Sequence, residues 1–254
     1  CSVFLVNHLS DRDIRDMASN EDSVWIASAG GATHWLWDAE TEEYTTSRYT
    51  TANGMPGNDT KAVAIDGNGN PYFVIAGKGL AVYLRSTDEW RSIELTLTDV
   101  AECAQTPTTQ MVDIAVNRES GTLYVSFTGG VVYGTSGNWS CWPRNEGIPD
   151  GDVKKVDLAP NGDVWVTTDF GLGRYRQGSG WKRFTPPDRL PSPEVNGVSF
   201  IEGDVWISTQ DGAVVVGNGD RIHPFQASRI LSFAADDEGH VIGRGTHFEE
   251  RFAR

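Results

Sequence analysis

Short apolar runs that end in a small polar turn recur along the chain. Five of them share one pattern, in which an aromatic residue stands six positions before a glycine. The runs are Ser23–Gly31, Pro71–Gly79, Thr122–Gly130, Asp163–Gly171 and Asp204–Gly212, with Trp25, Phe73, Tyr124, Trp165 and Trp206 as their aromatic residues. Such runs between glycine turns are typical of β-hairpins. Their repetition indicates a repeat architecture.

A second recurring element precedes another strand in each unit. It places an apolar residue, usually followed by a proline, and then a polar turn before the strand, as in Gly54–Val63, Gly147–Val156 and Arg189–Val198. Alignment of six such segments brings one position into register, which we call the aligned column: Asp13, Asp59, Gln110, Asp152, Glu194 and Arg229. Successive positions lie 35 to 51 residues apart. The number of residues from Arg229 to the C-terminus, added to the number from the N-terminus to Asp13, falls in the same range. This equal spacing favours a closed ring over an open array.

One typical unit, Glu194–Phe225, divides into four short strands at its Gly and Asp turns. Four antiparallel strands per unit are the pattern of a propeller blade. We therefore predict one all-β domain over residues 1–254, a six-bladed β-propeller with four-stranded antiparallel blades. The segment after Arg229 has residues for only three strands, so Val3–Asn7 is expected to supply the outer strand of the last blade and to pair its open edge.

The repeats resemble a known family of propeller repeats. The stretch Gly162–Pro191, followed by Gly203–Val214, is similar to the two-component-regulator-type propeller repeat, which forms periplasmic sensor regions of some bacterial hybrid histidine kinases. The resemblance implies the propeller fold. It does not imply signalling, because those receptors carry longer propellers, a transmembrane helix and kinase modules that this sequence lacks.

The first residues resemble the processed start of a bacterial lipoprotein. The sequence opens at Cys1 and Ser2, with neither an initiator methionine nor a signal sequence. The resemblance implies lipidation of Cys1 and an extracytoplasmic location, periplasmic or at the cell surface, with the protein anchored in a membrane by that lipid. The alternative is a shortened chain that begins at a cysteine by chance.

Composition and charge exclude two classes of partner. The chain has 254 residues, 21 Lys and Arg against 35 Asp and Glu, and a net charge of -14. A binder of the nucleic-acid backbone needs a basic surface that releases counterions, and adhesion to anionic lipid headgroups needs one too. We expect no nucleic-acid partner.

The aligned column is the sharpest candidate binding feature. Asp13, Asp59, Gln110, Asp152, Glu194 and Arg229 are expected just before the innermost strands, around one mouth of the central channel. Such a ring would attract a cation or a basic protein segment. The preferred alternative is turn chemistry, in which each Asp accepts hydrogen bonds from nearby backbone N–H groups without reference to the others.

No metal or cofactor site is predicted. Asp66, Asn68 and Asn70 resemble half a calcium loop, but Pro71 and Gly77 occupy the positions that need Gly and a bidentate Glu. A hairpin turn is the preferred interpretation of this segment. The five histidines, His8, His34, His223, His240 and His247, form no zinc motif.

The sequence contains no recognisable catalytic motif. It has no GxSxG elbow, no P-loop and no sialidase-type Asp box. We therefore predict a non-catalytic protein. A propeller lyase or lactonase, with its site assembled from distant loops, stays an alternative because fold does not set function.

Two further features concern aromatic residues and cysteines. Trp35 and Trp37 could stack on sugar rings, although strand alternation places at least one face of His34–Trp37 in the core. Cys103 and Cys141 could form a disulfide in an exported protein, and a pair of buried thiols is the alternative.

These observations favour a protein-interaction scaffold, a lipid-anchored accessory subunit of a bacterial membrane-associated complex whose partners are other proteins. The first alternative is a periplasmic sensor or binding protein for a small ligand or oligosaccharide. The second is the lyase or lactonase.

Overall fold

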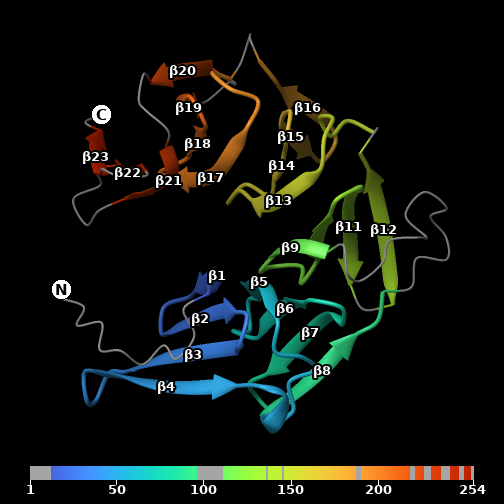
Figure 1. Cartoon of the computed structure of the whole chain (residues 1–254), viewed down its shortest axis with the longest axis vertical. Helices are drawn as coiled ribbons and strands as arrows, with labels where there is room; N and C mark the ends of the chain where they lie inside the picture. Colours follow the sequence, from blue (N-terminus) through green and yellow to red (C-terminus); the bar gives the residue numbers. More distant parts are fainter. Residues whose placement is uncertain are drawn as a thin grey trace. The chain divides into compact units, whose positions relative to one another are not determined.

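The structure is a computed structural model that describes residues 13–95, 111–135, 137–144, 146–186, 190–217, 221–225, 230–235, 241–245 and 249–252. The described chain is almost entirely β (Figure 1). Its helical element is the 3₁₀ turn η1 (Thr51–Asn53), which Thr50 caps through a hydrogen bond from the backbone N–H of Ala52. No helix among these residues is long and apolar enough to cross a membrane.

The strands form six antiparallel sheets in chain order. Blade 1 contains β1 (Ile14–Ser19), β2 (Ser23–Ser28), β3 (Gly31–Asp38) and β4 (Glu43–Tyr49), and blade 2 contains β5 (Thr60–Ile65), β6 (Pro71–Ile75), β7 (Gly79–Leu84) and β8 (Glu89–Ile93). Blade 3 contains β9 (Met111–Val116), β10 (Leu123–Phe127), β11 (Gly130–Thr135) and β12 (Asn138–Pro143). Blade 4 contains β13 (Val153–Leu158), β14 (Val164–Thr168), β15 (Gly171–Arg176) and β16 (Gly180–Phe184). Blade 5 contains β17 (Val195–Ile201), β18 (Asp204–Thr209), β19 (Gly212–Gly217) and β20 (Arg221–Phe225), and the last sheet contains β21 (Ile230–Ala235), β22 (Val241–Gly245) and β23 (Glu249–Phe252).

The prediction of six four-stranded blades is wrong. The part of the chain that the structure describes forms five four-stranded blades, and the last sheet has three strands. The described residues after Arg229 form β21, β22 and β23, in line with the three strands that the sequence predicts there. The segment Val3–Asn7, expected to supply a fourth strand, lies outside the described residues.

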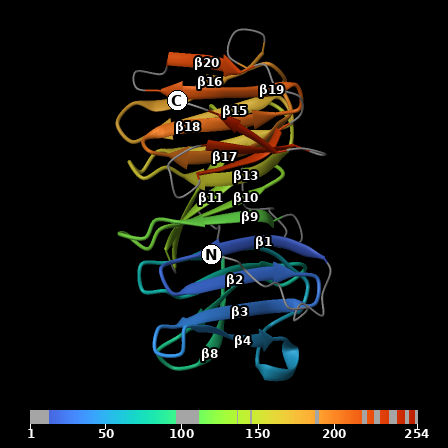
Figure 2. The ribbon, with the colours of Figure 1, turned by 90° about the vertical axis from the view of Figure 1, so that its left-hand side faces the viewer.

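The chain divides into two compact units. The first unit comprises residues 1–96, 107–123 and 134–139, and so contains blades 1 and 2 together with β9. The second unit comprises residues 97–106, 124–133 and 140–254, with blades 4 and 5 and the last sheet. Within the first unit, Figure 2 shows β1, β2, β3 and β4 side by side in chain order. A single domain over residues 1–254 stays a prediction.

A β-bulge opens the first strand of five sheets. The register shifts lie between Ile14 and Asp16, Thr60 and Ala62, Val153 and Lys155, Val195 and Gly197, and Ile230 and Ser232. The skipped residues are Arg15, Lys61, Lys154, Asn196 and Leu231, each two positions after the aligned column. A bulge redirects a side chain away from the regular alternation of its strand. This redirection prepares the contacts of Arg15 and Lys61 described below.

The glycine six positions after the aromatic residue is required for a steric reason. Gly31 and Gly171 open the third strands of their blades with φ values of 130° and 135°, a region that side chains rarely adopt. A Cβ atom on Gly31 would lie 2.2 Å from the carbonyl oxygen of Tyr49, and one on Gly171 would lie 2.5 Å from that of Phe184. The third strand therefore approaches the end of the fourth too closely for any larger residue.

The aromatic residues of the second strands form the core. In the first unit, Trp25 of blade 1 is wholly buried and packs edge-on against Phe73 of blade 2, with ring centroids 5.9 Å apart. In the second unit, Trp165 of blade 4 packs against Phe184, and Trp206 of blade 5 packs against Phe233 of the last sheet. These contacts cross from one sheet to the next in two of the three cases, which explains why an aromatic residue recurs at this position.

Candidate functional site

The aligned column lies directly before the first strands. Asp13, Asp59, Asp152 and Glu194 each precede the first residue of β1, β5, β13 or β17, and all four are exposed. Gln110 and Arg229, the other two members of the column, lie outside the described residues. The candidate binding site can therefore be followed at four positions.

The backbone at these positions anchors a neighbouring turn. The carbonyl oxygen of Asp59 accepts a hydrogen bond from the backbone N–H of Ala76 at 2.8 Å, and that of Glu194 accepts one from Gln210 at 3.0 Å. The carbonyl oxygen of Asp13 accepts a hydrogen bond from the backbone N–H of Ala29 at 3.3 Å. Because a main-chain carbonyl serves this purpose in any residue type, the turn does not account for the carboxylates.

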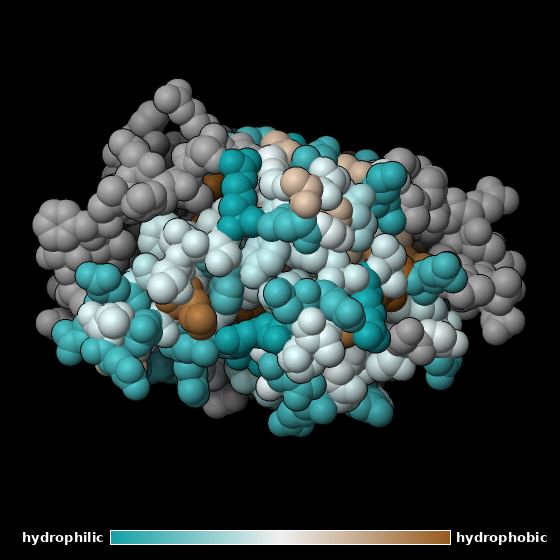
Figure 3. Space-filling view, turned by 90° about the horizontal axis from the view of Figure 1, so that it is seen from below, coloured by the Kyte–Doolittle hydropathy of each residue, from teal (hydrophilic) through white to brown (hydrophobic). Residues whose placement is uncertain are grey.

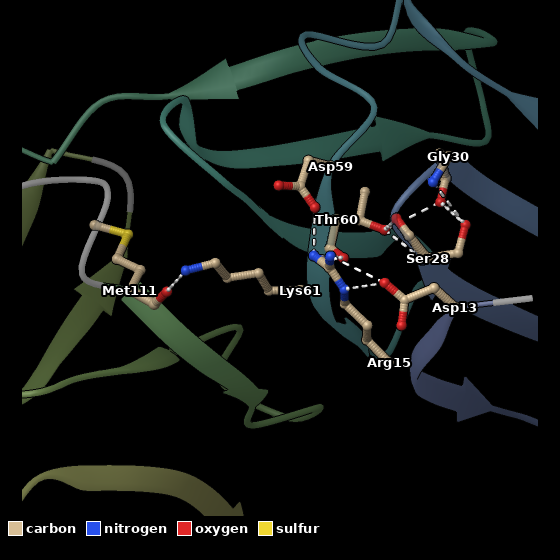
Figure 4. Close-up of polar contacts among 9 residues, drawn as sticks. Asp13, Arg15, Ser28, Gly30, Asp59, Thr60, Lys61 and Met111 are labelled. Atoms are coloured by element: carbon tan, nitrogen blue, oxygen red, sulfur yellow. Dashed lines mark hydrogen bonds and ion pairs between the residues drawn. The ribbon is translucent and has the colours of Figure 1, made fainter.

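In the first unit, one arginine joins two carboxylates of the column. Arg15 donates from Nη2 to Asp13 Oδ2 at 3.1 Å and from Nη1 to Asp59 in the next blade (Figure 4). It also donates from Nη1 to the carbonyl oxygen of Thr60 at 3.3 Å. Burial alone would lower the pKa of Arg15, but its hydrogen bonds to Asp59 and Asp13 outweigh that effect and the pKa is raised. Asp13 and Asp59 therefore share the single positive charge of Arg15.

Lys61 repeats the cross-blade contact of Arg15. Its Nζ donates to the carbonyl oxygen of Met111 at 3.2 Å, from the bulge of β5 to the first residue of β9 (Figure 4). Met111 occupies the same place in its strand as Thr60. Basic residues two positions after the column thus tie adjacent first strands together. We did not predict this role, although the recurrence of Arg15, Lys61 and Lys154 at one aligned position was a readable signal.

In the second unit, the column is also paired with basic residues. Asp152 lies 3.4 Å from Arg144 Nη1, and its backbone N–H donates to Asp169 Oδ2 at 3.1 Å. Lys154 Nζ lies 2.6 Å from Asp169 Oδ1. The hydrogen bond from Lys154 lowers the pKa of Asp169, although its burial acts in the opposite direction. Exposed pairs of this kind contribute about 0 to 1 kcal/mol each, so they set local charge more than stability.

These ion pairs change how the carboxylates of the aligned column are interpreted. Asp13, Asp59 and Asp152 each have a basic partner within 3.4 Å or less. No group of three His, Cys, Asp or Glu side chains in the described ranges is arranged to hold a metal ion. These three carboxylates therefore each lie beside a positive charge, and the binding role of the column stays a prediction.

An exposed phenylalanine stands beside this charged surface in the second unit. Phe170 lies in the β14–β15 turn, and 58% of its surface is exposed. Its ring lies against Gly151, where an added Cβ would come within 2.7 Å of Cδ2. A hollow of about 380 Å³ adjoins it, lined by Pro149, Asp150, Arg183 and Thr185. We call Phe170 with this hollow and the flanking Arg144, Asp152, Lys154 and Asp169 the Phe170 surface.

Figure 3 shows one face of the molecule. That face is mainly hydrophilic or neutral, and its hydrophobic side chains form small separate spots. Single exposed apolar residues are ordinary on protein surfaces. An exposed aromatic ring beside a hollow and near two ion pairs has features of a protein interface, where an aromatic anchor that the complex buries has polar residues at its edge.

A serine–histidine pair in blade 1 is structural. Ser23 Oγ and His34 Nε2 lie 2.9 Å apart, but both residues are buried, and the His34 ring stacks on Trp25 at 4.1 Å. Burial lowers the pKa of His34 to about 4, and nearby Arg85 adds to the shift. His34 therefore stays neutral near pH 7 and has no access to a substrate.

Trp35 and Trp37 differ in their exposure to solvent. Trp37 is partly exposed, and both rings pack against Tyr44 of β4, with centroid distances of 5.9 Å for Trp35 and 4.9 Å for Trp37. The predicted core contact of this stretch is made by His34 instead. Sugar stacking on Trp37 stays a prediction.

The segment Asp66–Pro71 is a hairpin turn, as predicted. Asp66 Oδ1 accepts hydrogen bonds from the backbone N–H groups of Asn68 at 2.9 Å and Asn70 at 2.8 Å. Oδ2 accepts from Asn70 Nδ2 at 3.1 Å. The carboxylate is used in closing the turn between β5 and β6, as turn chemistry requires.

The structure describes one of the two cysteines that are predicted to form a disulfide. Cys141 of β12 is disulfide-bonded. Cys1 and Cys103 are the other two cysteines of the chain, and both lie outside the described residues. The pairing of Cys103 with Cys141 therefore stays a prediction, as does the lipid on Cys1.

Comparison with known proteins identifies the fold. No protein-family model and no curated protein sequence matches the chain. The chain is similar to a catalytically inactive variant of virginiamycin B lyase from Staphylococcus aureus with quinupristin, at 12% identity and a TM-score of 0.68, over 96% of this chain and 85% of the lyase. It is similar to PorZ, an essential bacterial surface component of the type-IX secretion system of Porphyromonas gingivalis, at 14% identity and a TM-score of 0.69, over 92% of this chain and 39% of PorZ.

A third similar structure is an extracellular domain assigned to a hybrid two-component system of B. thetaiotaomicron. The identity is 15% and the TM-score 0.56, over 92% of this chain and 38% of that protein. The chain thus spans about two fifths of PorZ and of this receptor domain. At such identities the likeness shows the fold alone: the protein is an all-β propeller built from four-stranded antiparallel blades, as the repeat pattern predicts.

Proposed function

We propose that this protein is a non-catalytic docking module of an extracytoplasmic protein complex, and that the Phe170 surface is where a partner protein binds. The observation that carries the proposal is the exposure of Phe170 beside a hollow and near two ion pairs, Arg144–Asp152 and Lys154–Asp169. Aromatic anchors in such surroundings provide most of the binding free energy at protein interfaces.

The charges of the rim support a protein partner. Arg144 pairs with Asp152 and Lys154 pairs with Asp169, and Asp169 lies next to Phe170 at Gly151. A surface of alternating charge discriminates between partners, because a wrong partner places like charges opposite one another. A surface for a highly charged polymer would instead carry one sign.

The disulfide supports an extracytoplasmic location. Cys141 is bonded in a disulfide, and such bonds persist in oxidising compartments. A lipid on Cys1 would hold the protein at a membrane and near other components. PorZ, which shares the fold, is itself a surface component of a secretion system. We therefore propose that this protein lies at the cell surface or in the periplasm and is anchored through a lipid on Cys1.

A non-catalytic role is supported by the state of the groups that could react. Ser23 and His34 are buried in blade 1, and the pKa of His34 is too low for a general base near pH 7. Asp13 and Asp59 of the column share Arg15, and Asp152 pairs with Arg144. The lyase fold does not argue against this, because one fold serves many functions.

The test is quantitative capture of partners from native membranes. Full-length wild-type protein, Phe170→Ser and Tyr44→Ser are compared under identical detergent conditions. Tyr44 is a matched control, because it is exposed and aromatic but belongs to β4 of the first unit. We expect Phe170→Ser to reduce the stoichiometric partners by about tenfold or more, since an aromatic anchor contributes about 2 kcal/mol. Equal capture by both variants would refute the Phe170 surface as the docking site.

A further inference from the structure

The outer strand of blade 1 has an open edge. β4 is the last strand of its sheet, and Figure 2 shows it beside β3 at the outside of blade 1. It pairs with β3 over seven positions without a register shift. Its residues from Glu43 to Arg48 are all exposed. An exposed strand edge presents a row of N–H and C=O groups that can pair with another strand.

The outer strands of the other four-stranded blades carry features that discourage such pairing. β12 and β20 contain proline, at Pro143 and Pro224, and β16 carries the adjacent basic residues Lys182 and Arg183. β8 has five residues, against seven in β4. The central residues of β4 are Tyr, Thr, Thr and Ser, with neither a charge nor a proline or glycine among them. Because tyrosine and threonine also favour strands, β4 is the outer strand of these five blades best suited to pair with another strand.

The direction of the edge groups follows from the hydrogen bonds of β3. The backbone N–H of Trp37 donates to the carbonyl oxygen of Asp22, on the side of β2, at 2.7 Å. Trp37 faces Tyr44 in the register of β3 and β4. In an antiparallel ladder Tyr44 must then direct its N–H and C=O away from β3, and alternation gives Thr46 and Arg48 the same direction. These three residues form the edge.

One of the three residues is already engaged at the edge. Asn53 of the turn η1 donates from Nδ2 to the carbonyl oxygen of Arg48 at 2.8 Å, so this turn closes one end of the edge. Within the described ranges, no hydrogen bond reaches the outward N–H or C=O of Tyr44 or Thr46. The unpaired part of the edge is therefore centred on Thr45.

The symmetry of this segment defines its partner. Tyr44 and Thr46 are equally far from Thr45, so in an antiparallel pair of identical strands Tyr44 of one copy is opposite Thr46 of the other. Each copy then satisfies the outward N–H and C=O groups of both residues. Each copy has one such edge, so the assembly closes at a dimer. We propose that β4 pairs antiparallel with β4 of a second copy of this chain, across a two-fold axis at Thr45.

The side chains along the edge match in this register. Glu42 is opposite Arg48 of the second copy, twice by symmetry, and opposite charges across strands stabilise a pair. Arg48 also donates from Nη2 to the carbonyl oxygen of Gly30 at 3.2 Å, and a guanidinium has further N–H groups for a carboxylate. Thr45 is opposite its own copy, and threonine pairs are favourable as well. This match favours a second copy over an unrelated strand.

The dimer is expected to be weak. Two pairs of residues form about four backbone hydrogen bonds, fewer than the roughly ten of a typical interface. The dimer fraction should therefore depend on protein concentration. The association is independent of docking at the Phe170 surface, because β4 belongs to the first unit and Phe170 to the second.

Thr45→Cys in the full chain tests the register. At the two-fold axis the two Thr45 residues form a pair without hydrogen bonds, with Cα atoms about 4.5 Å apart. A disulfide fits that separation. We expect mild oxidation to convert most of Thr45→Cys into covalent dimers. Ser92→Cys is the matched control, since Ser92 is exposed on the short outer strand β8, and it should give no more dimer than the wild type.

Thr45→Lys and Thr46→Pro test the association itself, by analytical ultracentrifugation over a range of concentrations. Thr45→Lys places two ammonium groups opposite each other and leaves the backbone intact. Thr46→Pro removes an outward N–H and no hydrogen bond to β3. Each should weaken the dimer about tenfold or more, whereas Ser92→Lys and Thr46→Val should associate like the wild type. Thermal melting verifies folding, and Thr45→Lys keeps the test decisive where Thr46→Pro destabilises the blade.

Several results would overturn the assignment. They are a monomeric wild type at every concentration, equal crosslinking of Thr45→Cys and Ser92→Cys, equal association of Thr45→Lys and Ser92→Lys, or assemblies of more than two copies. Crosslinking of Thr45→Cys to a different protein in native membranes, without a dimer, would also contradict it. Thr45→Lys should capture partners like the wild type, and Phe170→Ser should dimerise like the wild type, so failure of this proposal and failure of the docking proposal are distinguishable.

Discussion

Asp163→Ala tests the energetic role of the buried charges in blade 4. The carboxylate of Asp163 accepts two hydrogen bonds from Arg176 and lies near Arg174, whose side chain is also buried. The backbone of Asp163 is not affected, and its carbonyl oxygen continues to accept a hydrogen bond from Ala159 at 2.9 Å. The substitution therefore removes the anion and leaves the hairpin.

The expected loss of stability follows from what remains behind. Removing one partner of a buried ion pair costs about 3 to 5 kcal/mol, because the other charge stays buried. Arg176 is 44% exposed and can turn to water, whereas Arg174 cannot. We therefore expect the lower part of this range, about 3 kcal/mol. For a chain of this size that corresponds to a fall in melting temperature of about 6 to 12 °C.

The control is Asp152→Ala, and the assay is denaturant unfolding followed by tryptophan fluorescence and circular dichroism. Asp152 is 63% exposed and pairs with Arg144 at the surface. Its loss should cost about 0 to 1 kcal/mol and should vanish at high salt. The loss in Asp163→Ala should persist at high salt. A cost below about 1 kcal/mol for Asp163→Ala would refute the view that this cluster is a buried structural pair.

Two further predictions concern blade 1. Because the pKa of His34 is about 4 in the folded protein and 6.5 in its ordinary state, the unfolded chain binds more protons between these values. Stability should therefore fall as pH drops from about 6.5 to about 4, by at most about 3 kcal/mol, and His34→Gln should lack this part of the pH dependence in urea titrations; identical pH profiles would contradict the assignment. Gly31→Ala should cost about 2 to 4 kcal/mol, because the new Cβ meets the carbonyl of Tyr49, whereas Gly162→Ala should cost about 1 kcal/mol from backbone strain alone; equal melting temperatures would show that the close approach is unimportant.

The repeat was readable from the sequence because its causes are local. Trp25, Phe73 and Trp165 recur where a second strand must fill the core, and Gly31 and Gly171 recur where a Cβ would strike the fourth strand. Spacing alone therefore predicted four-stranded blades and their turns. The count of complete blades was wrong, because it depended on pairing residues at opposite ends of the chain, which local patterns do not specify.

The candidate site was only partly readable. The alignment placed Asp13, Asp59 and Asp152 correctly before their first strands, but it did not show which charges they meet. Arg15 reaches Asp59 because a bulge redirects its side chain, and a bulge has no fixed sequence signature. Arg174, Arg176 and Asp204 line one hollow because blades 4 and 5 pack together, and no single repeat encodes that packing.

The most direct test of the docking proposal is site-specific photocrosslinking in native cells. A photoreactive phenylalanine analogue is placed at Phe170 or at Tyr44, both exposed aromatic positions. The account predicts a discrete adduct with one partner protein from position 170, absent from position 44 and lost when Lys154→Glu inverts a charge of the rim. Absence of any adduct at position 170, or the same adducts from both positions, would contradict the account.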